Sequence, residues 1–248
     1  MKKILALIAV SFSYIGLSAQ TVTINYTEGA IVSPEKLKEF PVAVQNAILE
    51  KNFYILTTSN NASEYRIDPA SEKKRMIAPE IKTKVIMQEN ERYYYKDYAH
   101  NELVFEIGNG TDVFQGKDDL KKWTWKITNE TKVIAGYKCK KATTEYLGNP
   151  ITAWFTADLP KNAGPDRFDS LPGTILSIVM PKYEYTATSV KVAASNTSID
   201  KPVFKDKTYT MAEMNYAISA KTAATRPGET SEKSGNGATY TKTVTYTY

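Results

Sequence analysis

The sequence predicts a mainly β protein, built on a curved antiparallel sheet or half-barrel with one helix early in the chain and one near the C-terminus. Two observations predict this fold class. The chain contains 17 Tyr and 8 Phe, residue types that are enriched in strands. Short segments of alternating apolar and polar residues are separated by turn residues, which is typical of an antiparallel meander. A closed β-barrel or a two-sheet sandwich is the alternative.

The first 19 residues predict a signal peptide. Lys2 and Lys3 give a positively charged start, residues 4–17 are largely apolar, and Ala19 supplies a small residue at the cleavage site. The apolar stretch is shorter than the roughly 20 residues that a membrane-spanning helix needs. We therefore expect an exported protein, in the periplasm, at the outer membrane or secreted, with no membrane span once the signal is removed.

The rest of the chain is expected to form a single β-rich domain over residues 20–224, followed by a tail over residues 225–248. Residues 228–238 are polar and rich in Gly and Ser, which predicts a flexible segment. Residues 239–248 alternate Thr with Tyr and Val, so the end of this tail could form an edge strand.

The first half of the domain begins with residues 21–27, whose period-two alternation predicts a half-buried strand. Ser33-Pro34 then predicts the start of a helix that extends to Lys51 and that Pro41 kinks or splits. Further strands are predicted, between short polar turns, at residues 53–57, 63–67, 85–87, 92–98 and 102–107.

In the second half, Trp123 and Trp125 are expected to share one face of a strand, and residues 129–131 to form a turn. Two hairpins are then predicted, one from strands 139–146 and 151–156 and one from strands 174–180 and 183–193. The spacing of Thr210 and Glu213 fits a capping box, which predicts a helix that extends to about Ala224.

Charge and composition bear on the partners. The formal net charge is +5, of which Lys2 and Lys3 contribute two, and the other basic residues are scattered along the chain. This balance argues against nucleic acid as a partner. The expected partner is instead a ligand of the cell envelope or an outer-membrane protein.

Cys139 and His100 are the only residues of their types, so a conventional zinc site is not expected, and neither is any other metal or cofactor. Free cysteine is among the most buried residue types, which favours a buried, inert Cys139 over a reactive thiol. His100 is expected to be an exposed turn residue and not a catalytic base.

A Pro-Gly pair precedes the apolar run of residues 175–179. Pro172 and Gly173 predict a structural turn of type II, in which Gly173 supplies the positive φ. Just before this turn, residues 166–169 (Asp-Arg-Phe-Asp) form a polar cluster. The cluster could be a ligand clamp, or its Asp side chains could stabilise the turn locally.

Aromatic and turn motifs follow one another in a fixed order: Trp123 and Trp125, Ile134-Ala135-Gly136-Tyr137, Cys139, Lys141-Ala142, Ala153-Trp154-Phe155, Asp158-x-Pro160, Gly164-Pro165 and Leu171-Pro172-Gly173-x-Ile175-Leu176. In this order and spacing they resemble the GLPGLI family of exported Bacteroidetes proteins. Ser170 departs from the Gly that begins the family's motif, and Thr174 departs from its second Leu. Ser170 indicates that this position does not need positive φ. The resemblance implies no established reaction and therefore no catalytic residue.

The pattern favours a non-enzymatic binding or carrier protein for a hydrophobic or glycan ligand, or for an outer-membrane partner. The residues expected to contact that ligand combine charge with aromatic surface: Asp166, Arg167, Asp169, Trp154 and Tyr94. An enzyme that uses the carboxylates of Asp158, Asp166 and Asp169 is one alternative. A purely structural envelope component is the other.

Overall fold

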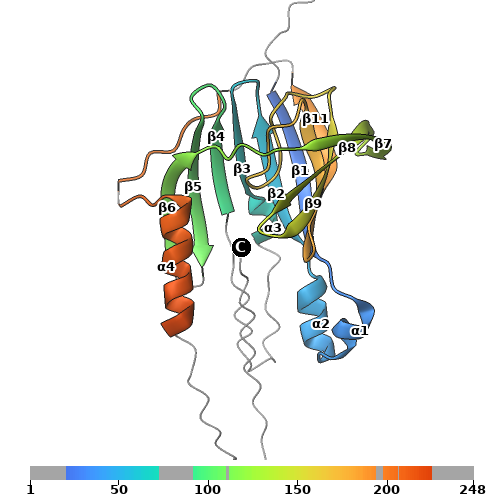
Figure 1. The fold of residues 1–248 in the computed structure, drawn as a ribbon, viewed down its shortest axis with the longest axis vertical. Helices are drawn as coiled ribbons and strands as arrows, with labels where there is room; N and C mark the ends of the chain where they lie inside the picture. Colours follow the sequence, from blue (N-terminus) through green and yellow to red (C-terminus); the bar gives the residue numbers. More distant parts are fainter. Residues whose placement is uncertain (1–20, 73–91, 110–111, 194–197, 206, 225–248) are drawn as a thin grey trace, which may run out of the picture.

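The computed structural model describes residues 21–72, 92–109, 112–193, 198–205 and 207–224, which form one open antiparallel sheet of eleven strands (Figure 1). The strands lie in the order β6-β5-β4-β3-β2-β1-β11-β10-β9-β8-β7. Strands that are neighbours in the sheet are also neighbours in sequence, except β1 and β11, which pair at the centre. β6 and β7 are the two edges, so the predicted open sheet is confirmed and neither a closed barrel nor a sandwich forms.

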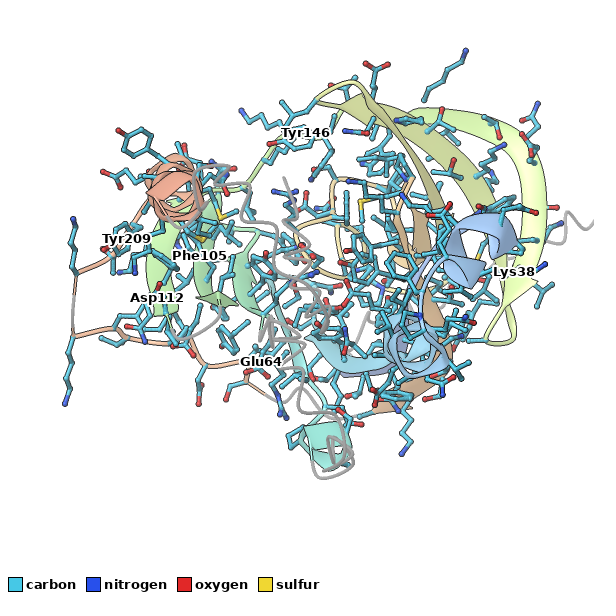
Figure 2. The ribbon with its side chains drawn as sticks, turned by 90° about the horizontal axis from the view of Figure 1, so that it is seen from below. Lys38, Glu64, Phe105, Asp112, Tyr146 and Tyr209 are labelled. Carbon is cyan, nitrogen blue, oxygen red and sulfur yellow. The ribbon has the colours of Figure 1, made fainter. Side chains whose placement is uncertain are left out.

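The chain builds the sheet in two halves. The first half contains β1 (Thr21–Ala30), β2 (Asn52–Thr58), β3 (Ala62–Ile67), β4 (Arg92–Asp97), β5 (Glu102–Asn109) and β6 (Asp112–Asp119). The second half contains β7 (Lys126–Ile134), β8 (Tyr137–Tyr146), β9 (Asn149–Thr156), β10 (Thr174–Val179) and β11 (Tyr183–Ala193). Viewed from below, the strands form an arc around an interior filled with side chains (Figure 2).

The two predicted helices begin where the sequence places them, and a short helix that was not predicted is added. The expected early helix is split into α1 (Pro34–Lys38) and α2 (Val42–Leu49), because Pro41 cannot continue a helix and instead occupies the N-cap of α2. The short α3 (Pro69–Glu72) follows β3. α4 (Met211–Ala224) lies beside the β6 edge (Figure 1).

The predicted capping box begins α4. The backbone N–H of Glu213 donates to Thr210 Oγ1 at 3.2 Å, and the backbone N–H of Thr210 donates to Glu213 Oε2 at 2.8 Å. Met214 on α4 is buried against the core of the protein. Phe105 and Tyr209 lie next to the helix (Figure 2), and Tyr209 adds a short parallel bridge to Gly116 of β6.

In β1 and β2, alternate residues are buried in the arc, and tyrosines form the central layer of this core. Tyr54 and Tyr65 stack with ring centroids 4.9 Å apart, and Tyr26 meets Tyr65 edge to face at 6.3 Å. The hydroxyl of Tyr26 donates to the carbonyl of Ile175 at 2.5 Å, which satisfies its polar end inside the core. The three rings belong to the first half of the sheet, and the Tyr26 hydroxyl links them to β10 in the second half.

Residues 157–173, between β9 and β10, fold into the interior of the arc; we call them the plug loop. Ala163, Phe168 and Leu171 are each at most 1% exposed. Asn162 N–H donates to the carbonyl of Leu171 at 3.0 Å, and Ile175 N–H donates to that of Ala163 at 2.8 Å. The interior of the sheet is therefore filled by the chain itself.

The turn at Pro172-Gly173 exists, but it differs from the predicted type II turn. Gly173 does not have positive φ, whereas Ser170 does (69°), so both expectations about backbone conformation here are wrong. Gly173 N–H donates to the carbonyl of Leu171 at 2.8 Å, which centres a γ-turn on Pro172. A Cβ on Gly173 would lie 2.0 Å from the carbonyl oxygen of Thr156, so close backbone contact requires glycine here.

The link between the two halves also differs from expectation. Trp123 and Trp125 do not lie on a strand; they belong to residues 120–125, which cross from the β6 edge to the β7 edge (Figure 1) and which we call the crossing segment. Residues 129–131 are not a separate turn. They lie inside β7, where the register against β8 shifts between Ile127 and Thr131. β6 is a strand that the sequence pattern did not predict.

Four predictions lie outside the described residues: the signal peptide (1–19), the strand at 85–87, the flexible tail (225–248) and its edge strand (239–248).

Replacing Gly173 with Ala should lower the free energy of unfolding by about 1–3 kcal/mol or more, because the new Cβ would overlap the Thr156 carbonyl. Urea denaturation followed by tryptophan fluorescence would measure the loss. Gly29→Ala is the matched control, since its Cβ would meet only the Lys51 side chain at 3.7 Å. Equal losses in the two variants would contradict the close-contact explanation.

Candidate functional site

A buried ion network fastens the plug loop to the sheet. Arg92 Nη1 of β4 donates to Asp166 Oδ2 of the plug loop at 2.9 Å and to Glu28 Oε1 of β1 at 3.2 Å. The hydroxyl of Tyr185, on β11, lies 3.0 Å from each of these carboxylate oxygens and 2.5 Å from Arg92 Nη1. Because the four side chains come from both halves of the sheet and from the loop, the network fixes all three parts relative to one another.

The electrostatics of the network keep Asp166 ionised. Burial alone would raise the pKa of Asp166, but the positive charge of Arg92, assisted by Arg167, holds it below its ordinary value. Burial raises the pKa of Tyr185 well above its ordinary value, so its hydroxyl keeps the proton that it donates. The Arg92 guanidinium is thus the cation that makes the burial of two carboxylates tolerable.

A second buried cation on β4, Lys96, holds the end of the plug loop. Lys96 Nζ donates to the carbonyl of Phe168 at 2.9 Å and lies 3.5 Å from Asp169 Oδ2. The latter distance is an ion-pair contact and is too long for a good hydrogen bond. Asp169 Oδ1 accepts a hydrogen bond from Ser170 Oγ at 2.7 Å, whereas Oδ2 has no hydrogen-bond donor among the described residues. Asp169 therefore keeps a buried oxygen able to accept a hydrogen bond.

The crossing segment is hydrogen-bonded to residues 167–169 of the plug loop. Trp123 Nε1 donates to the carbonyl of Arg167 at 3.0 Å, and Trp125 Nε1 donates to that of Asp169 at 2.8 Å. The ring of Trp123 also packs against Phe168, at 4.9 Å between centroids, and against Tyr146, at 5.6 Å. Both indole rings thus point toward the plug loop. They share a side, as the sequence predicted, although their backbone is not a strand.

A pocket of about 110 Å³ opens where the crossing segment, α4 and the end of β8 meet; we call it the rim pocket. It is lined by Lys96, Leu103, Asp118, Asp119, Leu120, Lys121, Tyr146, Arg167, Asp169, Met211 and Asn215. Asp119 and Lys121 are exposed, so solvent reaches its rim, while Lys96 and Asp169 are buried in its wall. In Figure 2, Tyr146 lies apart from α4, near the crossing segment.

The structure separates the five residues predicted to contact a ligand. Arg167 and Asp169 both line the rim pocket. Asp166 is enclosed in the Arg92 network, and Tyr94 is buried in the core. Trp154 lies on the opposite face of β9 from the buried Ala153 and Phe155, with Lys132 Nζ 4.4 Å above its ring.

The sequence pattern did not identify Arg92, Lys96, Glu28 or Tyr185 as parts of this region. A signal was present for the two cations: Arg92, Tyr94 and Lys96 alternate along β4, so both charges share a strand face with a large aromatic residue. A charged residue on such a face needs a buried partner of opposite charge. The partners, however, lie 64 or more residues away in sequence and could not be paired without the fold.

The unique cysteine and histidine lie apart from the rim pocket. Cys139 is fully buried, as predicted, and burial raises the pKa of its thiol to about 11. His100 is exposed in the turn after β4, and its Nδ1 lies 2.7 Å from Asp97 Oδ2. In the part of the chain that the structure describes, no three His, Cys, Asp or Glu side chains gather closely enough to hold a metal ion. No helix there is long and apolar enough to cross a membrane.

Comparison with known families corrects the resemblance drawn from the sequence. Residues 43–217 match the family model described as "N-glycanase peptide, N-terminal domain". The match spans well over half of the chain and overturns the similarity to the GLPGLI family. The motifs behind that similarity lie largely in the crossing segment, the plug loop and the strands next to them. No curated protein matches the chain.

Two solved structures of PNGF-II share the fold. The structure in space group C2 has 24% sequence identity and a TM-score of 0.50, and covers 73% of this chain and 29% of its own. The structure in space group P21 has 23% identity with the same TM-score and coverage. The chain thus matches less than a third of the length of these proteins.

Replacing Arg92 with Met should lower the free energy of unfolding by about 3–5 kcal/mol, because Glu28 and Asp166 would remain buried without their cation. Urea denaturation would measure the loss. Arg66→Met is the control, since the Arg66 side chain is 40% exposed and, among the described residues, pairs with Glu64 alone, at 3.4 Å; it should cost less than about 1 kcal/mol. A similar small cost for both variants would contradict the role given to Arg92.

The lowered pKa of Asp166 predicts a specific pH dependence. Ionised Asp166 stabilises the fold above the pKa of an unfolded Asp, about 3.9, and this contribution is lost as the pH falls through the lower pKa of the folded state. As the pH is lowered below about 4, the free energy of unfolding of Asp166→Asn should therefore fall less steeply than that of the unmodified protein. Urea denaturation at several pH values would measure the two slopes. Identical slopes would show that Asp166 does not contribute.

Proposed function

The chain belongs to the family of the N-glycanase peptide N-terminal domain, and on this premise we propose that it binds glycans through the rim pocket, as a recognition module and not as a catalyst. The observation that carries the proposal is that Asp169 lines the pocket, while its carboxylate Oδ2, itself buried, has no hydrogen-bond donor among the described residues. A sugar hydroxyl is a donor of the right kind for such an oxygen.

The lining favours a saccharide over a hydrophobic ligand. Of the lining residues, Leu103, Leu120 and Met211 form an apolar wall, whereas most of the others are charged. Sugars combine apolar ring faces with many hydroxyls, so they can use both parts of such a pocket. A carrier of a large hydrophobic ligand would need an open interior, and the plug loop occupies that space.

Binding is favoured over catalysis because two of the three candidate acidic residues, Asp158 and Asp166, do not line the pocket. Asp166 is bonded to Arg92 and Tyr185 inside the network and does not line the pocket. Asp158 is exposed and does not line it either. Asp169 alone of these three lies in the pocket wall, and acid–base hydrolysis of a glycosidic bond ordinarily uses two carboxyl groups. Asp118 and Asp119 also line the pocket, but Asp118 accepts hydrogen bonds from two backbone N–H groups and Asp119 is exposed to solvent.

The cellular setting remains part of the proposal. Export to the periplasm, the outer membrane or the medium rests on the signal-peptide pattern of residues 1–19. In that setting the ligand would be a glycan of the cell envelope or the glycan of a glycoprotein. An outer-membrane protein that carries glycans would satisfy both expectations about the partner.

Isothermal titration calorimetry with an N-glycosylated peptide tests the proposal. The peptide should bind, and the same peptide without its glycan should not. Tyr146→Ala, which removes one wall of the rim pocket, should weaken binding roughly tenfold or more. Tyr137→Ala is the matched control, because Tyr137 is also half-buried but lies at the other end of β8.

Thermal unfolding of both variants would establish that they remain folded at the temperature of the titration. Absence of any glycan-dependent heat with the unmodified protein would reject glycan binding. Equal affinity of the unmodified protein and folded Tyr146→Ala would place the glycan somewhere other than the rim pocket.

A further inference from the structure

Two cations in the rim pocket converge on one aromatic ring, and neither forms an ion pair with a carboxylate of the described residues. Burial disfavours the charge of Arg167, but the nearby Asp166 carboxylate raises its pKa. Lys121 Nζ lies 3.8 Å from the ring centroid of Tyr146, and the guanidinium carbon of Arg167 lies 5.3 Å from it. Both distances are within the range of cation–π contacts. No carboxylate of the described residues lies within ion-pair distance of either cation.

The two cations also disfavour each other. Partial burial and the positive charge of Arg167 lower the pKa of Lys121. Arg167 is held in place by its backbone, since its N–H donates to Asp166 Oδ1 at 2.6 Å and its carbonyl accepts from Trp123. The plug loop and the crossing segment therefore keep two like charges close together, where an anion placed between them would relieve the repulsion.

The acidic residues that line the same pocket do not form ion pairs with Lys121 or Arg167. Asp169 faces Lys96, with its Oδ2 3.5 Å from Lys96 Nζ. Asp118 accepts hydrogen bonds from the backbone N–H groups of Met211 and Asp119, so its charge is directed toward the start of α4. Asp119 is exposed to solvent, where its charge is screened.

We propose that Lys121 and Arg167 form a subsite for the acidic group of a sugar, a carboxylate or a sulfate, so that the rim pocket selects acidic over neutral glycans. This inference rests on the proposed glycan binding and adds the substrate class. The acidic group contacts the two cations, while neighbouring hydroxyls of the same sugar face the Asp169 side of the pocket. A pocket of about 110 Å³ is small by the standard of ligand sites, and it takes one sugar unit and not a long oligosaccharide.

The test compares matched sugars by isothermal titration calorimetry at low ionic strength. The probes are a sialylated oligosaccharide, a sugar that carries a sulfate ester, the neutral counterpart of each, and inorganic sulfate alone. The acidic sugars should bind roughly tenfold or more tightly than their neutral counterparts. This preference should shrink as salt is added, because one of the two cations is exposed.

The variants Lys121→Gln and Arg167→Gln should remove most of the preference, because they should weaken the binding of acidic sugars far more than that of neutral sugars. Arg167→Lys, which keeps the charge, should retain part of it. Lys122→Gln is the matched control, since Lys122 is the exposed neighbour of Lys121 and does not line the pocket. The side chains changed here are at least partly exposed and form no hydrogen bond or ion pair with the described residues, so the variants should fold.

Each outcome decides a different point. Equal binding of acidic and neutral sugars would overturn this inference and leave glycan binding intact. A preference that survives in both Gln variants would place the acidic group elsewhere and would also overturn it. Inorganic sulfate that binds as tightly as the acidic sugars would reduce the subsite to a simple anion site. No binding of any sugar would reject the proposed function itself.

Discussion

The ion network centred on the guanidinium of Arg92 is the interaction on which the rest of the structure depends. It joins β4 to Glu28 on β1 and to Asp166 on the plug loop, and Tyr185 of β11 closes the set. In a buried region of low dielectric, an unpaired charge is costly, so these partners have essentially one arrangement in which all are satisfied. The position of Asp166 then fixes the residues that follow it, Arg167 and Asp169, which form part of the rim pocket.

The plug loop holds its conformation at a local cost. Asn162, Asp166 and Ser170 have φ values of 65°, 53° and 69°, a region that residues other than glycine adopt at an expense of roughly 1–2 kcal/mol each. Hydrogen bonds offset this strain: each of the three residues forms one within the loop. A loop stabilised in this way presents its side chains to the pocket in a fixed geometry, which lowers the entropic cost of binding.

Local patterns were sufficient to predict most of the elements, and they failed where long-range contacts decide. Alternation in β1, the prolines around α1 and α2, and the capping box of α4 each act within a few residues of sequence. The conformation of Gly173 is set instead by the Thr156 carbonyl, and the crossing segment by carbonyls in the plug loop. Arg167 and Asp169 could be proposed as site residues from the sequence, because they belong to one local polar cluster. Lys96 could not, because it lines the same pocket from β4, in the other half of the sheet.

The open sheet has two edges, and both are protected against pairing with another chain. On β6, Tyr209 exchanges backbone hydrogen bonds with Gln115 and Lys117, and α4 lies beside the same strand. On β7, the register shift between Ile127 and Thr131 interrupts the regular ladder, and most of its side chains, charged ones among them, are exposed. An irregular, charged or covered edge is a poor template for adding strands. A sheet of eleven strands can therefore stay open, with a pocket at its rim, without becoming a nucleus for aggregation.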